Sequence, residues 1–578
     1  MVFQPDAYYD IPFVDLLSWT LDNLTYDEDK DIFIDAADDT RRLTARQART
    51  LVRKLVGGLK EIGVKPGDCI CLHSFNDILY SPIYLGIIGA GGRFVGSNPG
   101  YTYLELHHLL STSKTRFIIV EPELLEKILP AAHDFGIPDS NILIFNPRRA
   151  SIPDGFVSWE TLLQHGESDW IRFDDEQTAK NTTAALLSTS GTTGLPKAAA
   201  ISHFAHVAQS KLLYDSKDKP YQVSRLLCLP QFHAFAAPLV HIAPLREGHT
   251  TYIMRRFDLE KYMGCIKRYQ ITETAMVPPI MASVSESALA KTGLISSLRY
   301  IWCAGAPLST SINRQMMNLL DPNAIISQVW GMTEIGWITT FLFPERDESN
   351  SVGRLLPNME AKLIDRNGKE VTKECCSGEI YVRGPSIMSS YLGNPEATSA
   401  SFEDGWLKTG DIAYCKSGKW YIIDRVKDLI KVRGWQVSPA ELESCLLMHP
   451  RIIDAAVVGI QNSTHDSELP RAFVVVDPDS PYPVKEKEIK SFVRARLAKY
   501  KALDGGVRFV KSIPRNASGK ILRPMLINGT MIEWEDKSNS QGPSNPIAKK
   551  KLRVRLSRRL LSFMGKTSRA FNSMRAKY

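Results

Sequence analysis

The first 400 or so residues of the sequence alternate short apolar runs with amphipathic helical stretches, and this alternation limits the possible folds more than any other feature. Apolar residues recur at helical spacing from Ala48 to Leu59, and residues 69–72 (CICL) then form a continuous apolar run. The same order returns with RFIIVEP (116–122), a helix-like stretch and NILIF (141–145). Because continuous apolar strands are typical of parallel sheets covered on both faces, these units predict a large doubly wound α/β domain.

A smaller unit with shorter elements follows after about residue 425. Ser438, Pro439 and Glu441 predict a helix start, with an N-cap, a first-turn proline and the acid of a capping box. The apolar runs AAVVGI and RAFVVV, a helical pattern from Ile489 to Tyr500 and the strand-like VRFV (507–510) predict a compact α+β unit. Residues 537–548 are rich in Ser, Asn, Pro and Gly, which is typical of a linker. The expected division is a large domain at 1–424, a small mobile domain at 425–535, and a linker with a basic tail at 536–578.

Charge and composition exclude several functions. The 578 residues are 44% hydrophobic and 23% charged, which is typical of a soluble protein with more than one core. The net charge is +8, but 11 Lys and Arg residues and no acid lie between Lys549 and Lys577, so residues 1–548 carry −3. Nucleic-acid binding by the body of the protein is therefore not expected. Nine cysteines without zinc-site spacing favour a reducing compartment, and the acidic N-terminal segment argues against a secretory signal.

The segment from Leu186 to His203 (LLSTSGTTGLPKAAAISH) is the most informative one for chemistry. A Ser, Thr and Gly-rich turn after an apolar run offers hydroxyls and accessible backbone N–H groups to a polyphosphate, and Lys197 adds a positive charge. The spacing is not that of a Walker loop. A flexible surface loop has the same composition, so this segment needs support from other motifs.

Four further motifs follow in order, at residues 328–336 (QVWGMTEIG), 406–411 (WLKTGD), 421–443 (YIIDRVKDLIKVRGWQVSPAELE) and 514–523 (PRNASGKILR). Together with the first segment they resemble the adenylate-forming superfamily, which includes acyl-CoA synthetases, 4-coumarate:CoA ligases, firefly luciferases and peptide-synthetase adenylation domains. The resemblance covers about residues 40–530 and is greatest to the 4-coumarate:CoA ligase-like branch of fungi and plants, with an expected role in specialised metabolism. It implies that a carboxylate and ATP form an acyl-adenylate, from which coenzyme A then displaces AMP.

The resemblance implies a set of residues for ATP and Mg²⁺. Those expected around the phosphates are Ser188, Thr189, Ser190, Gly191, Thr192, Thr193, Gly194 and Lys197. Thr333 and Glu334 match the contacts to the α-phosphate and to Mg²⁺, for which one carboxylate is enough because this cation keeps several waters. Trp330 and Gly331 are expected beside the adenine. Asp411 and Arg425 are expected to hold the two ribose hydroxyls. Without the motifs, Glu334 would be read as a surface acid, Trp330 as a core residue, and Asp411 with Arg425 as a surface ion pair.

Catalysis and acid binding are assigned in the same way. Lys520 matches the lysine that reaches the carboxylate and α-phosphate, where negative charge must be neutralised. His233 lies in the Phe-His form of acyl-CoA synthetases, without the Asp that pairs an amino-acid ammonium, so an uncharged aryl or aliphatic tail is expected. Residues expected to line the acid pocket are Ala234, Phe235, Met276, Val277, Gly305 and Ala306.

The second half-reaction is assigned to the KVRGWQV stretch. Lys431, Gly434 and Trp435 match positions that meet coenzyme A, which favours a thioester-forming ligase. Two alternatives stay open: an acyl-AMP ligase that loads a carrier protein, and a luciferase-like oxygenase. The residues Ala198-Ala199-Ala200 depart from the usual family sequence after Lys197, with a small expected effect.

The tail lies outside the resemblance. Leu552, Leu556, Leu560 and Phe563 recur near helical spacing among Lys and Arg, which predicts either a membrane-surface helix that binds anionic lipid or a solvated basic tail. The last three residues, Ala-Lys-Tyr, differ from the Ser-Lys-Leu peroxisomal signal. The expected location is cytoplasmic, with peripheral membrane contact through the tail as the alternative.

Overall fold

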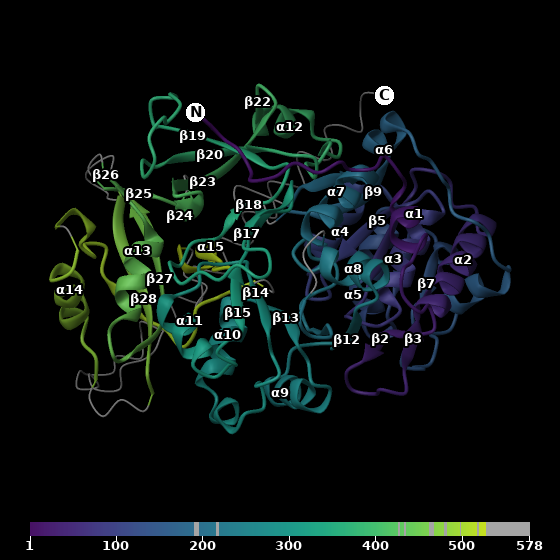
Figure 1. The fold of residues 1–578 in the computed structure, drawn as a ribbon, viewed down its shortest axis with the longest axis horizontal. Helices are drawn as coiled ribbons and strands as arrows, with labels where there is room; N and C mark the ends of the chain where they lie inside the picture. Colours follow the sequence, from purple (N-terminus) through teal and green to yellow (C-terminus); the bar gives the residue numbers. More distant parts are fainter. Residues whose placement is uncertain are drawn as a thin grey trace, which may run out of the picture.

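The structure is a computed structural model that describes residues 1–189, 196–214, 219–425, 428–432, 435–461, 468–478, 483–497, 499–516 and 519–527. Figure 1 shows a large α/β body and, at the left of the view, a smaller unit coloured green to yellow. The predicted α/β class with a separate C-terminal unit is confirmed.

The predicted strand–helix units lie in an eight-stranded sheet. Residues Cys69–His73 form a fully buried strand that pairs in parallel with a neighbour on each side, as its continuous apolar run predicts. The sheet order is β21-β10-β9-β5-β4-β6-β7-β8. The strands are β4 (Cys69–His73), β5 (Arg93–Ser97), β6 (Thr115–Val120), β7 (Ile142–Ile144), β8 (Val157–Ser158), β9 (Thr183–Ser188), β10 (Ala198–Ser202) and β21 (Ser390–Tyr391).

A second sheet of seven strands has the order β15-β14-β13-β11-β12-β2-β3. Its neighbouring pairs are parallel except for the β2–β3 edge, so the carboxyl ends of its central strands meet at one edge. The strands are β2 (Asp31–Asp35), β3 (Arg42–Thr44), β11 (Ser224–Leu227), β12 (Thr250–Ile253), β13 (Glu273–Met276), β14 (Tyr300–Cys303) and β15 (Ile325–Gln328).

Helices cover both sheets. The stripe predicted from Ala48 to Leu59 lies on a helix that starts at a Thr44–Gln47 capping box and buries Ala48, Val52, Leu55 and Leu59. The helices of the large body are α1 (Leu16–Leu21), α2 (Ala45–Glu61), α3 (Tyr80–Gly89), α4 (Tyr103–Ser113), α5 (Pro122–Asp134), α6 (Glu176–Asn181), α7 (His203–Tyr214), α8 (Ala243–Glu247), α9 (Leu259–Arg268), α10 (Pro278–Glu286), α11 (Thr310–Met317) and α12 (Pro395–Ser401).

Two antiparallel sheets complete the large body. The larger one joins the N-terminal strand to the end of the body, where Phe3 packs edge-on against Trp420 with ring centroids 5.1 Å apart. Its strands are β1 (Val2–Phe3), β19 (Glu360–Ile364), β20 (Gly378–Arg383), β22 (Phe402–Glu403), β23 (Trp406–Lys416) and β24 (Lys419–Arg425). The smaller one contains β16 (Trp330–Met332), β17 (Gly336–Thr340) and β18 (Arg354–Leu355).

The C-terminal unit has its own hydrophobic core around Val457, Val474 and Ile489. Ser438 caps its first helix by accepting a hydrogen bond from the Glu441 N–H, as predicted. The second helix ends at Arg494, shorter than the predicted pattern, and Tyr500 packs on the core from a following turn. The elements are β25 (Ile430–Val432), β26 (Trp435–Val437), α13 (Pro439–Leu447), β27 (Ile452–Gln461), β28 (Glu468–Val476), α14 (Glu486–Arg494), β29 (Val507–Phe509) and α15 (Arg523–Ile527).

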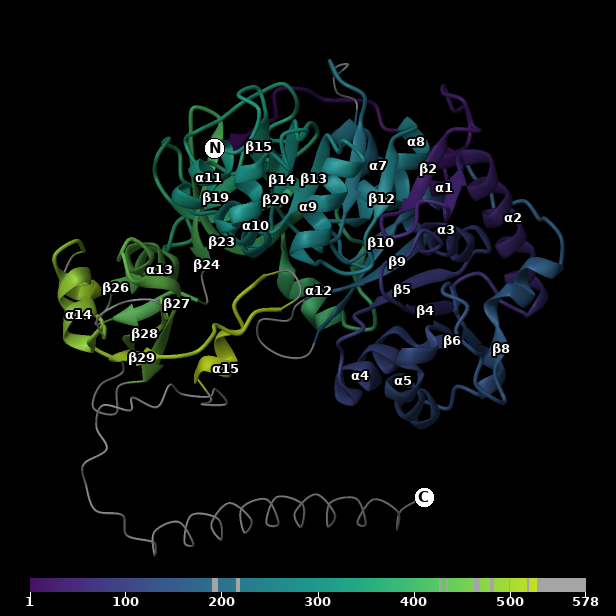
Figure 2. The ribbon, with the colours of Figure 1, turned by 90° about the horizontal axis from the view of Figure 1, so that it is seen from below.

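The two ends of the C-terminal unit face different ways. Figure 1 shows β25 and β26 at the outer edge of this unit, and Figure 2 shows the chain after β29 running towards the large body and leading to α15. In the part of the chain that the structure describes, no helix is long and apolar enough to cross a membrane.

Candidate active site

The predicted phosphate-binding segment is the connection between the antiparallel strands β9 and β10. Its base is closed by two hydrogen bonds, from the Thr189 N–H to the Lys197 carbonyl (2.8 Å) and from the Lys197 N–H to the Thr189 hydroxyl (3.3 Å). Ser188 ends β9. The remaining predicted residues of this segment lie outside the described residues: Ser190, Gly191, Thr192, Thr193 and Gly194.

Glu334 lies next to this segment. It is 7% exposed, and its Oε1 accepts a 2.6 Å hydrogen bond from the Tyr391 hydroxyl, while Thr333 beside it is half-buried. The Lys197 ammonium lies over the Tyr391 ring, 4.5 Å from its centroid, so one side chain contacts both predicted groups. Burial, and secondarily the charge of Glu334, raises the pKa of Tyr391, so its hydroxyl stays a donor.

Sequence reasoning did not identify Tyr391. The pairing of β21 with β10 aligns Tyr391 with Ala199, just after the phosphate-binding segment. The two strands lie about 190 residues apart in the sequence, so no local pattern indicates this contact. Ala199 and Ala200, two of the alanines that depart from the family sequence, are the residues of β10 that pair with β21. Their small side chains are compatible with regular strand pairing at these two positions.

Glu334 has the features of a single-carboxylate Mg²⁺ ligand. Tyr391 engages its Oε1, and its Oε2 has no hydrogen-bond partner among the described residues. Within the described ranges, no group of three or more His, Cys, Asp or Glu side chains gathers into a metal cage. One carboxylate that acts together with substrate phosphates and water is the usual way in which proteins bind Mg²⁺.

Trp330, Asp411 and Arg425 form one polar cluster. Strands β23 and β24 align Asp411 with Arg425, and the Arg425 Nε lies 3.0 Å from Asp411 Oδ1. The Trp330 indole N–H donates to Asp411 Oδ2 at 2.9 Å. Both carboxylate oxygens are therefore engaged in this structure, which fixes the orientation of Asp411 while Trp330 stays 91% buried.

The neighbouring Gly331 meets a strict steric limit. A Cβ on Gly331 would lie 2.2 Å from the carbonyl oxygen of Gly336, across the β16–β17 pair. Only glycine allows this close backbone approach, so any larger residue would displace the turn that holds Glu334.

Lys520 lies close enough to His233 for its charge to act on the ring, although the two residues belong to different units. The Asn516 side chain accepts from the Lys520 N–H at 2.9 Å and holds the turn, and Gly519 has a φ of +79°. A Cβ on Gly519 would lie 3.0 Å from the ring of Pro279 in α10, so this turn rests directly on the large body. Burial and the Lys520 charge lower the pKa of His233 to about 4, so its ring is neutral at pH 7.

The predicted acid pocket lies around this pair. The Phe235 N–H donates to His233 Nδ1 at 3.2 Å, and the Phe235 ring packs against Trp337 with centroids 5.3 Å apart. Val277 is buried in the same hydrophobic cluster, and Ala234 is half-buried against it. Gly305, with a φ of +93°, and Ala306 follow the carboxyl end of β14 and are accessible.

Met276 has a different environment. Its side chain is fully buried in a second hydrophobic cluster between the seven-stranded sheet and its helices. Trp337, which was not identified from the sequence, instead contacts Phe235 directly, because its indole N–H donates to the Phe235 carbonyl at 3.3 Å. The available sequence signal was its position three residues after Glu334, near the start of the strand β17.

The residues predicted for coenzyme A lie apart from this pair. Lys431 is exposed on β25, and its N–H donates to Glu468 at 2.8 Å. Gly434 and the side chain of Trp435 lie outside the described part of the chain. Lys431 lies on β25, at the outer edge of the C-terminal unit, whereas Lys520 lies in the segment between β29 and α15, which runs towards the large body.

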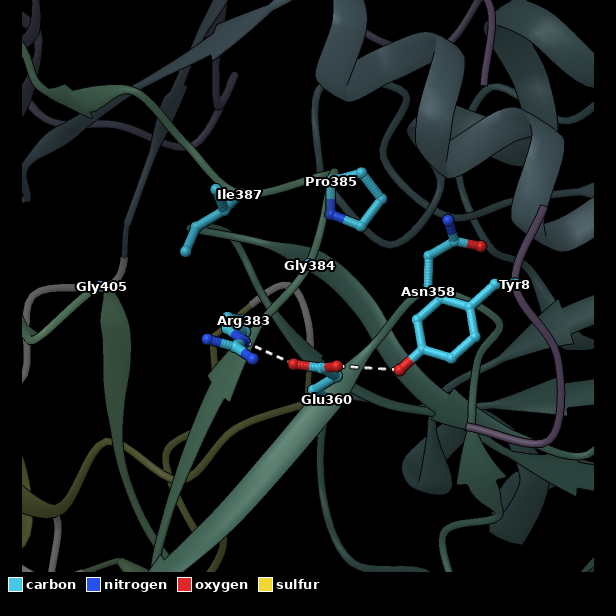
Figure 3. A pocket seen from close by; sticks show the side chains of 8 residues that line it. All are labelled: Tyr8, Asn358, Glu360, Arg383, Gly384, Pro385, Ile387 and Gly405. Carbon is cyan, nitrogen blue, oxygen red and sulfur yellow. Dashed lines mark hydrogen bonds and ion pairs between the residues drawn. The ribbon is translucent and has the colours of Figure 1, made fainter. Parts of the chain in front are cut away.

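A separate open pocket of about 350 Å³ lies beside the N-terminal segment (Figure 3). Glu360 at its centre accepts a 2.8 Å hydrogen bond from the Tyr8 hydroxyl and pairs with Arg383 on the other side. These charges satisfy one another, and none of the predicted site residues lines this pocket. The predicted site residues therefore lie elsewhere, around His233 and Glu334.

Comparison with known proteins agrees with this geometry. Residues 22–392 match the AMP-binding enzyme family, and residues 441–520 match the AMP-binding enzyme C-terminal domain. Two Aspergillus niger proteins, the acyl-CoA ligase azaF and the phenylacetyl-CoA ligase epaB, are each 47% identical over 534 residues, covering 91% of this chain and 100% and 98% of their own lengths. ATP-bound MatB from Rhodopseudomonas palustris has the same fold, with a TM-score of 0.78, 24% identity, and coverage of 90% of this chain and 99% of MatB. The chain therefore belongs to the AMP-binding enzyme family, among its acyl-CoA ligases.

Proposed function

We propose that this enzyme joins a small aryl or aliphatic carboxylic acid to coenzyme A through an acyl-adenylate, as a step of specialised metabolism. The observation that carries the proposal is the contact of the Gly519–Lys520 turn with Pro279, which brings the Lys520 charge to His233 at the acid pocket. A cation there neutralises the charge that builds up when a carboxylate oxygen attacks the α-phosphorus and pyrophosphate leaves.

ATP and Mg²⁺ fit the two clusters beside this pocket. Trp330, Asp411 and Arg425 offer an aromatic ring, a carboxylate and a guanidinium to the nucleoside, and Lys197 offers a charge to the phosphates. Glu334 would hold Mg²⁺, which neutralises phosphate charge when bound. Tyr391 orients the Glu334 carboxylate through its hydroxyl, and the neutral His233 ring leaves the positive charge at the acid to Lys520.

In the second step the coenzyme A thiol attacks the acyl carbon, and AMP leaves with the bonding electrons. We assign this step to a second pose of the C-terminal unit, with residues 425–535 moving as one body and bringing Lys431, Gly434 and Trp435 to the adenylate. The support is that β25, which carries Lys431, lies at the outer edge of that unit, whereas the segment between β29 and α15, which carries Lys520, runs towards the large body.

The test is pyrophosphate release with ATP over a panel of aryl, medium-chain, long-chain and α-amino acids. We expect release with aryl or short aliphatic acids and none with amino acids, because residues 226–240 around His233 include no Asp or Glu to pair an ammonium. Thioester formation with free coenzyme A supports the proposal. Transfer only to a carrier-protein phosphopantetheine, or light emission that depends on oxygen, would replace it with one of the two alternatives.

The basic tail supports a second, separate proposal of peripheral attachment to anionic membranes from the cytoplasm, rather than a peroxisomal location. Its 11 Lys and Arg residues without an acid contrast with the net charge of −3 of residues 1–548. Each basic residue near an anionic surface contributes about 1 kcal/mol. The tail lies outside the described residues, so this proposal depends on sequence alone.

Removing residues 549–578 should leave turnover in solution nearly unchanged and strongly lower binding to phosphatidylserine vesicles, measured by co-sedimentation. High salt should have the same effect on the full chain, because it screens the charges. Equal vesicle binding by the full and truncated chains at low salt would refute membrane attachment.

A further inference from the structure

A small cavity lies against Trp337. Its volume of about 20 Å³ leaves room for about one water, and its wall includes Leu213, Lys219, Tyr300, Trp302, Trp337 and Phe343. Trp337 contacts both this cavity and Phe235 of the predicted acid pocket. An acid whose carboxylate lies at His233 and Lys520 therefore has an aromatic wall with little free space beside the pocket.

The wall is rigid. Trp302 packs edge-on against Trp337, with ring centroids 6.3 Å apart, and in a tilted arrangement against Tyr300, with centroids 4.8 Å apart. Lys219 lies over the Tyr300 and Trp302 rings at 5.3 and 5.5 Å and pairs with the fully buried Glu273. Because these rings and charges hold one another, the wall does not yield easily to a long acyl chain, and its ring faces suit a flat aromatic group.

Gln209 supplies a polar group at this wall. It lies on α7 one turn before Leu213, and it is 6% exposed. Its Oε1 accepts a 2.6 Å hydrogen bond from the Trp337 N–H, and a Cβ on Gly336 would overlap this oxygen. Because that N–H can only donate, the amide oxygen faces Trp337, and the orientation of the Gln209 amide is fixed.

The other end of the same amide is unsatisfied. The Gln209 Nε2 group is buried and has no hydrogen-bond partner among the described residues. A buried N–H without a partner is costly, and native proteins seldom keep one unless water or a ligand pairs it. Gln209 bonds the backbone N–H of Trp337, whose side chain contacts Phe235 in the predicted acid pocket. An acid bound in that pocket is therefore the candidate partner for the amide.

We propose that the pocket selects compact aromatic carboxylic acids that carry a hydrogen-bond acceptor, which the Gln209 side-chain amide recognises. This specificity rests on the proposed ligase function and names its substrate class. Gln209 is then a specificity-determining residue: it binds the acid's tail, while Lys520 and His233 act at the carboxylate.

The experiment compares matched acids that differ in one ring atom: benzoic acid with its three pyridine analogues, and phenylacetic acid with its three pyridyl analogues. The readout is kcat/KM for ATP-dependent pyrophosphate release. We expect the wild type to prefer at least one pyridine acid over its carbocyclic partner by about tenfold or more, because the acceptor pairs the buried amide. Gln209→Leu should bring this ratio close to one, with the carbocyclic acid still turned over.

Gln209→Glu is the conservative second variant. It keeps an oxygen for the Trp337 N–H but lacks the amide donor, so it should also lose the preference. Gln177→Leu, at an exposed position on α6, should keep the wild-type ratio. Thermal melts of all variants separate lost recognition from lost folding.

The length limit is tested with decanoic acid, which the wild type should not activate and Trp337→Ala should. The proposal on Gln209 is overturned if the wild type shows no preference within either set, or if a folded Gln209 variant keeps the preference. If no acid of any kind releases pyrophosphate, the proposed ligase function itself is wrong. If acids are turned over but the pyridine acids and their carbocyclic partners have equal kcat/KM, only the proposal on Gln209 is wrong.

Discussion

Lys520→Ala should lower acyl-adenylate formation by about 10²–10³-fold and still convert supplied acyl-adenylate and coenzyme A into thioester. The reason is that Lys520 is the cation that reaches His233, and removing one preorganised charge partner typically costs this much. The measurement is single-turnover pyrophosphate release for the first half-reaction and thioester formation from synthetic acyl-adenylate for the second.

Lys431→Ala should show the opposite pattern, because Lys431 is exposed on β25 and is proposed to act only in the second pose. Lys511→Ala is the matched control, since Lys511 is an exposed lysine of the same unit that has no proposed role. If a normally folded Lys520→Ala enzyme slowed both half-reactions equally, the division of labour between two poses would be wrong.

Lowering the pH from 7 to 5 should destabilise the protein strongly, by at least about 10 °C in Tm. Burial lowers the pKa of six histidines to between about 3 and 4: His73, His203, His206, His233, His241 and His249. Below about pH 6.5 these groups bind protons in the unfolded chain but not in the folded one, so stability falls as pH falls towards 4.

The size of the effect follows from the number of protons. Each histidine protonated only in the unfolded state lowers the free energy of unfolding by about 1.4 kcal/mol per pH unit. Buried acids whose pKa is raised by burial, such as Asp77 and Glu443, take protons in the folded state and partly oppose this loss. Among the described residues, the six histidines outnumber the five acids whose pKa is raised by burial, namely Asp15, Asp77, Glu379, Asp424 and Glu443. All six histidine shifts cover the range from pH 6.5 to 4.

The measurement is Tm against pH, with two variants. His241 hydrogen-bonds Ser81 and Gln231 and stacks on Tyr84 with centroids 4.2 Å apart, so His241→Gln should flatten the slope by about one proton even where it lowers Tm. His165→Gln, at an exposed position, should leave the slope unchanged. A Tm that is flat from pH 7 to 5 would contradict the expected neutral burial.

Local patterns determined most of the secondary structure. The apolar run at residues 69–72 lies in a buried parallel strand, and Ser438 caps its helix, because both depend on contacts within a few residues. The helix predicted from Ile489 to Tyr500 is too long, because α14 ends at Arg494. Leu497 and Tyr500 still pack on the same hydrophobic core after the helix ends, so their spacing alone does not reveal the helix end.

The sequence by itself determined the family, the order of the two units and the types of residue available for the chemistry, because ordered motifs record local geometry and backbone requirements. Only the tertiary structure decided which groups meet. Tyr391 reaches Glu334 and Lys197 through a strand pair, Gln209 reaches Trp337 from a helix, and the Lys520 turn rests on Pro279. These contacts join segments far apart in the chain, and no local pattern specifies them, because they depend on how sheets, helices and units pack together.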